Sequence, residues 1–76
     1  MAINAADARQ LASIILGAYG EDYSTVAALL RPLRVSLPTI DWMGELRTVA
    51  ATHQPFIDSG LSIDWWCNVV DRQSQP

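Results

Sequence analysis

The sequence contains no lysine and only one cysteine, and its basic residues are outnumbered by acidic ones. Five arginines supply all of the basic charge against eight acidic residues, which gives a formal net charge of −3. A single cysteine excludes a disulfide within the chain. Binding to a phosphate backbone or to an anionic membrane surface needs several basic residues on one face, and the chain has no basic run. We therefore expect neither a nucleic-acid partner nor a membrane partner.

Long hydrophobic runs and a secretory leader are also missing. The longest apolar stretch covers residues 11–19, but Ser13 and Gly17 interrupt it, and it is far too short to span a bilayer. The residues that follow Met1 lack the basic head of a secretory signal. These features predict a soluble, cytoplasmic protein.

Side chains that carry chemistry are sparse. One cysteine and one histidine cannot supply the several ligands at short spacing that a metal site needs. Cys67 lies on an apolar helical face with Asp64 and Asp71 one turn away, and nearby carboxylates raise the pKa of a thiol, so we expect a buried, unreactive cysteine. His53 stands at a predicted helix end, where we expect it to satisfy the last free carbonyls. The sequence therefore predicts no catalytic, cofactor-binding or metal-binding residues and no small-molecule substrate.

Apolar residues recur at helical spacing in four segments, which span about residues 4–19, 22–31, 40–53 and 62–72. The first helix is expected to start from a cap at Asn4 and to have a wide apolar face that includes Ile14. The second has Leu29 on its buried side. It should end or bend at Arg31, because Pro32 disfavours helical geometry in the residue before it.

The predicted fold class is all-α, because no run of the sequence alternates with the period of two that is typical of a half-buried strand. We expect a small irregular bundle of four to five helices, the fifth being a short turn around residues 55–59 with Pro55 in its first position. Residues 1–72 are predicted to form a single helical domain. Residues 73–76 are predicted to be a polar tail or the start of a linker.

A phrase of hydroxyl, Ile, Asp, Trp and a large apolar residue occurs twice, at residues 39–43 and 62–66. Each copy predicts a helix start in which the hydroxyl of Thr39 or Ser62 accepts a hydrogen bond from a free backbone N–H. The aspartate that follows, Asp41 or Asp64, then lies in the first turn against the positive end of the helix dipole. The sequence thus predicts two helix starts, each tied to a tryptophan.

Tryptophan and arginine are the residues most suited to contact another protein. Three tryptophans are many for 76 residues, and tryptophan is favoured at interface hot spots. Trp65 and Trp66 point about 100° apart on a helix, so we expect Trp66 inside, packed on Leu61, and Trp65 partly exposed. Arginine suits interfaces because it pairs bidentately and stacks on rings. The predicted protein-contact residues are Trp65, Trp42, Arg47, Arg34 and Arg31.

Half of the residues are apolar, and a domain of this size buries only about 60% of its unfolded surface. An apolar patch left on a small protein often marks a partner site. The leading hypothesis is a non-enzymatic protein–protein interaction module, an adaptor or recruitment domain that binds itself or another chain. Death-fold adaptor domains have this size and helical make-up, a likeness of architecture alone.

Other functions remain open from the sequence. The main alternative is a small stand-alone inhibitor of the viral or phage type, which binds and blocks a host protein. A helix-turn-helix DNA-binding domain has less support, because its recognition helix needs side chains that reach base edges and the third segment offers only Arg47. An enzyme has less support for want of catalytic groups.

Overall fold

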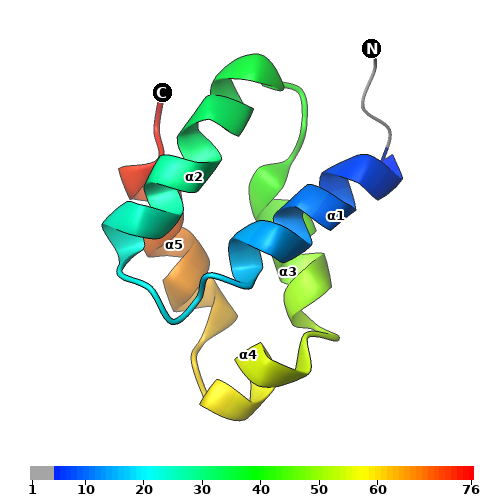
Figure 1. Ribbon diagram of the computed structural model, residues 1–76, viewed down its shortest axis with the longest axis vertical. Coiled ribbons are helices and arrows are strands. Elements are labelled where there is room, and N and C mark those ends of the chain that lie inside the picture. Colours follow the sequence, from blue (N-terminus) through cyan, green and yellow to red (C-terminus); the bar gives the residue numbers. More distant parts are fainter. Residues whose placement is uncertain (1–4) are drawn as a thin grey trace.

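The computed structural model describes residues 5–76, which form five helices and no strand (Figure 1). The helices are α1 (Ala5–Leu16), α2 (Tyr23–Ser36), α3 (Trp42–Ala50), α4 (Gln54–Ser59) and α5 (Ile63–Gln73). The predicted all-α fold class is confirmed, and the short turn expected around residues 55–59 is present as α4. No helix in this part of the chain is long and apolar enough to cross a membrane.

Helix α3 joins the parts of the bundle to one another. It packs against both α1 and α5, and the short α4 follows at its C-terminal end (Figure 1). Helix α2 packs along α5. The core between these helices receives side chains from all five helices, and the largest of those that are fully buried are Leu16, Leu30, Leu46 and Trp66.

The buried face of α1 is narrower than the sequence predicts. Ile15 and Leu16 are buried, but Ile14 is 64% exposed, so its predicted place on the apolar face is wrong. Helix α1 packs mainly on α3, and residues that point away from α3 therefore remain in solvent. On α2, Leu29 is exposed for the same kind of reason, because α2 packs chiefly on α5. The predicted cap at Asn4 lies outside the described residues.

Helix α2 continues through Pro32, so of the two outcomes predicted at Arg31, an end or a bend, the end is wrong. Proline removes the hydrogen bond that its own N–H would make, but the last turn of the helix is stabilised by tertiary contacts. Leu33 packs against the core, and the guanidinium of Arg34 donates a hydrogen bond to the carboxylate of Asp71 on α5 (2.6 Å). Packing of this kind decides many helix boundaries in proteins, and here it outweighs the local preference.

The two copies of the repeated phrase begin their helices in different ways. Ser62 caps α5, as predicted: its hydroxyl accepts a hydrogen bond from the backbone N–H of Trp65 (3.3 Å). In the first copy the cap is Asp41, whose carboxylate accepts from the N–H of Gly44 (3.1 Å), so the predicted cap at Thr39 is wrong. Residues 37–40 form a turn of their own, which places Thr39 too early for the free N–H groups of α3. A Cβ at position 44 would overlap the Asp41 carboxylate, and glycine leaves room for it.

The C-terminal end of the chain lies against α2. Gln73 is the last residue of α5 and Ser74 is fully buried, whereas a polar tail is predicted from residue 73 onward. The guanidinium of Arg31 donates to the backbone carbonyl of Gln73, and that of Arg34 donates to the hydroxyl of Ser74 (2.9 Å). These contacts tie the start of the predicted tail to the domain.

Candidate protein-contact surface

Large apolar side chains remain exposed at several places on the surface. Among the described residues they are Ile14, Leu29, Val35, Ile57, Leu61 and Trp65, which are 41–64% exposed. Ile57 and Leu61 differ from the others because both line a single, mostly apolar hollow. Exposed apolar residues that gather in one place mark partner sites, whereas scattered ones need no explanation.

We call this hollow the α3–α4–α5 groove. It has a volume of about 300 Å³ and is lined by Arg47, Ala50, Ala51, Phe56, Ile57, Leu61 and Ile63. Two of the lining residues are small alanines, and the side chains of Ile57 and Leu61 in the lining are partly exposed to solvent. Arg47 has the only lining side chain that forms hydrogen bonds, so the groove is suited to apolar side chains rather than to a small polar ligand.

One aromatic residue fixes the wall of the groove. Helix α4 has only six residues and is too short to be stable by itself. Its buried Phe56 packs edge-to-face against Trp66 of α5, with ring centroids 5.9 Å apart, and against Tyr19 in the segment after α1, at 5.7 Å. Such pairs contribute about 0.5–1.5 kcal/mol each beyond the burial of area. Phe56 thus holds α4, and with it Ile57, in place.

The two ends of α4 are set by His53 and Gly60. The backbone N–H of His53 donates to the carbonyl of Ala50 (3.4 Å), as expected at a helix end. Its imidazole has a role that the sequence did not predict: Nδ1 accepts a hydrogen bond from the N–H of Phe56 (3.3 Å) and so caps α4. Gly60 ends α4 with a φ of 74°, a left-handed conformation that glycine adopts without strain. The chain then turns, and Leu61 comes to line the groove.

Charged side chains are carried by the helices that form the groove. The Nε atom of Arg47 lies 3.4 Å from the carboxylate of Asp64 in the first turn of α5, and both side chains are exposed. Asp58, which follows Ile57 on α4, accepts a hydrogen bond from the side-chain amide of Gln54 (2.7 Å). The groove is therefore lined by one arginine, which is already paired with Asp64, and α4 carries a further carboxylate at Asp58.

The predicted contact residues are not brought together in one surface. Trp65 is 61% exposed, as expected, but it lies on α5 outside the lining of the groove. Trp42 is only 3% exposed, so it offers a partner almost no surface. Arg31 binds the backbone carbonyl of Gln73 at the C-terminal end of α5, and Arg34 binds the side-chain carboxylate of Asp71. Of the predicted residues, Arg47 lines the groove.

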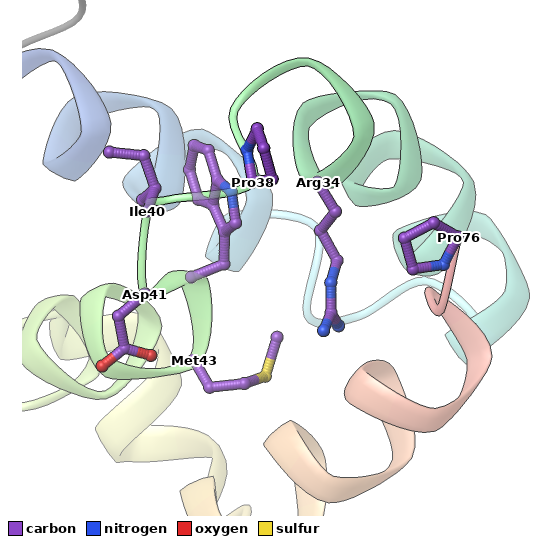
Figure 2. A pocket seen from close by; sticks show the side chains of 7 residues that line it. Arg34, Pro38, Ile40, Asp41, Met43 and Pro76 are labelled. Atoms are coloured by element: carbon purple, nitrogen blue, oxygen red, sulfur yellow. The ribbon is translucent and has the colours of Figure 1, made fainter.

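A second hollow, which we call the Arg34 pocket, lies between the end of α2, the start of α3 and the C-terminal residues (Figure 2). It has a volume of about 240 Å³ and is lined by Arg34, Pro38, Ile40, Asp41, Trp42, Met43 and Pro76. Figure 2 shows the Arg34 side chain directed into the hollow. Its guanidinium is bound by Asp71 and Ser74, and the Asp41 carboxylate caps α3. The charged groups of this pocket thus serve the fold.

Cys67 is buried on α5, and burial raises the pKa of its thiol to about 11. That pKa is the net result of burial, which raises it most, of Arg47, which lowers it, and of Asp64 and Asp71, which raise it. The thiol is therefore protonated and a weak nucleophile at neutral pH. Within residues 5–76, no group of three or more His, Cys, Asp or Glu side chains is placed to hold a metal ion.

Comparison with models of protein families, with curated proteins and with solved structures found no match for this chain. Its candidate site therefore rests on geometry and charge. Sequence reasoning missed the groove, although a signal was present: Phe56, Ile57 and Leu61 gather around Pro55 and Gly60 within seven residues. What the sequence did not reveal is that α4 places these side chains beside the end of α3.

Proposed function

We propose that this chain is a non-enzymatic protein–protein interaction module that holds its partner in the α3–α4–α5 groove. The observation that carries the proposal is the groove itself, which is apolar apart from Arg47 and is flanked by the half-exposed Ile57 and Leu61. Apolar surface in water costs about 25 cal/mol per Å². Apolar side chains of a partner would remove this cost at the groove more effectively than at the isolated exposed residues elsewhere.

The groove is also preformed, which favours recognition. Phe56 is fixed between two aromatic rings, and α3 is packed on both α1 and α5. A surface that is ordered before binding loses less conformational freedom when the partner arrives. The short α4 can therefore present Ile57 to another protein although it is too short to be a stable helix alone.

Site-specific photo-crosslinking in the cells that make the protein tests this function. A benzophenone amino acid at Leu61 is expected to form an adduct with a distinct protein, because that side chain lines the groove. The matched control is the same amino acid at Ile14, an exposed aliphatic residue on α1. Adducts that are identical from both positions, or none from Leu61, contradict the proposal.

A further inference from the structure

Every arginine side chain of the protein makes a contact within the fold. Three arginines form ion pairs and two donate to backbone carbonyls, and these contacts are Arg9–Glu45, Arg34–Asp71, Arg47–Asp64, Arg31 to Gln73 and Arg72 to Asn68. All five arginines of the sequence are thus engaged. Recognition of an acidic or phosphorylated partner uses clusters of arginine, and the lining of the groove has one arginine, Arg47, which is already paired with Asp64.

The surplus charge at the surface is negative. Glu21, Asp22, Asp41 and Asp58 take part in no ion pair within residues 5–76. Asp58 lies on the helix that forms one wall of the groove. The partner best suited to this surface brings basic residues. A second copy of the chain carries the same net charge of −3, and like charges brought together at an interface are unfavourable.

The structure around the groove excludes some forms of partner. Addition of a strand needs an open sheet edge, and the described part of the chain has no strand. Recognition of a polyproline segment needs an aromatic-lined groove, and Phe56, the one aromatic residue in the lining, is 3% exposed. The remaining form of partner is an amphipathic helix, which lays its apolar face into a groove between helices.

We propose that the occupant of the α3–α4–α5 groove is a basic amphipathic helix of a different protein. Its apolar stripe lies against Ile57 and Leu61, and its Lys or Arg side chains lie beside Asp58 and Asp64. The inference rests on the proposed function and adds the chemical class of the partner. Such a helix buries the apolar rim, adds a second cation to Asp64, which Arg47 already pairs, and meets Asp58, which takes part in no ion pair within residues 5–76.

A displayed library of helical peptides of about 18 residues, which make about five turns, provides the probe. The library is selected for binding to the wild-type protein and counter-selected against the Leu61→Asp variant, with Ile57→Asp as a second variant should the first fail to fold. Circular dichroism checks that each variant is folded. The enriched peptides are expected to carry a net positive charge and an apolar stripe at spacings of three and four residues.

The charge of the groove is tested on the best of these peptides. Asp58→Asn is expected to weaken its binding about two- to fivefold at low salt, since a surface pair contributes about 0.5–1 kcal/mol. Glu21→Gln, a control outside the groove, should leave the affinity unchanged.

Three results overturn the inference in distinguishable ways. Enriched peptides that depend on Leu61 but are acidic or uncharged overturn the class of partner and leave the groove as an interaction site. Self-association of the wild-type protein, if Leu61→Asp abolishes it, also overturns the class of partner. The occupant of the groove is then a second copy of the chain. Failure to enrich any peptide that depends on Leu61 or Ile57 overturns both the inference and the proposed function.

Discussion

The guanidinium of Arg34 on α2 binds the carboxylate of Asp71 on α5 at 2.6 Å, across 37 positions of sequence. The same nitrogen donates to the hydroxyl of the buried Ser74. The Arg34 side chain is only 20% exposed, so solvent screens the pair less than it screens an ion pair at the surface. One residue thereby joins α2, α5 and the C-terminal segment.

Arg34→Ala is expected to lower the free energy of unfolding by about 1–3 kcal/mol, because it removes the charged donor that the Asp71 carboxylate and the Ser74 hydroxyl share. Urea denaturation measures the loss. Arg9→Ala is the matched control, since the Arg9–Glu45 pair has a 54% exposed arginine and should contribute less than about 1 kcal/mol. Equal losses from the two variants would show that the Arg34 contacts stabilise no more than a surface pair.

The repeated phrase gives a second matched test. Ser62→Ala and Asp41→Ala each remove a cap and should each cost about 1 kcal/mol of unfolding free energy. Thr39→Ala removes the hydroxyl from the corresponding place in the first copy but breaks no cap, so its effect should lie within about 0.5 kcal/mol. A loss from Thr39→Ala as large as that from Ser62→Ala contradicts the assignment of the α3 cap to Asp41.

Adjacent tryptophans should differ sharply in their contribution to stability. Trp66 is 1% exposed and packs on Phe56, so Trp66→Ala should cost about 3–5 kcal/mol. Trp65 is 61% exposed, and Trp65→Ala should change the unfolding free energy by less than about 1 kcal/mol. Thermal denaturation followed by circular dichroism measures both. A larger loss of stability from Trp65→Ala than from Trp66→Ala would contradict the burial of Trp66 in the core.

The raised pKa of the Cys67 thiol predicts a loss of stability at alkaline pH. Folding raises the pKa of its thiol from 9.0 to about 11, so the folded state favours the protonated form. The resulting stabilisation is complete below pH 9 and is lost as the pH rises toward 11. Urea denaturation at a series of pH values should show a weaker alkaline decline in Cys67→Ala than in the wild type. Identical declines would mean that the thiol does not contribute.

The features that follow from neighbouring residues were predictable. Ser62 caps α5, Pro55 lies in the first turn of α4, Gly60 ends that helix, and Trp66 is buried beside an exposed Trp65. Each depends on a local backbone preference or on the 3.6-residue helical period, and both can be read from sequence.

The features that depend on which helices meet were not predictable. The path of α2 through Pro32 is stabilised by α5, and Ile14 is exposed because α1 packs mainly on α3. The cap at Asp41 depends on a turn that precedes α3. The groove requires the end of α3, α4 and the start of α5 to come together, and the helical spacing of apolar residues in the sequence carries no such information.

The mass of the isolated protein in solution, measured by light scattering over a wide range of concentration at low salt, tests most directly whether the groove receives a different chain. The charge and geometry of the surface predict a monomer of 8.4 kDa at every concentration. A mass that doubles as the concentration rises, and that returns to the monomer value in Leu61→Asp, would contradict this and make the chain its own partner.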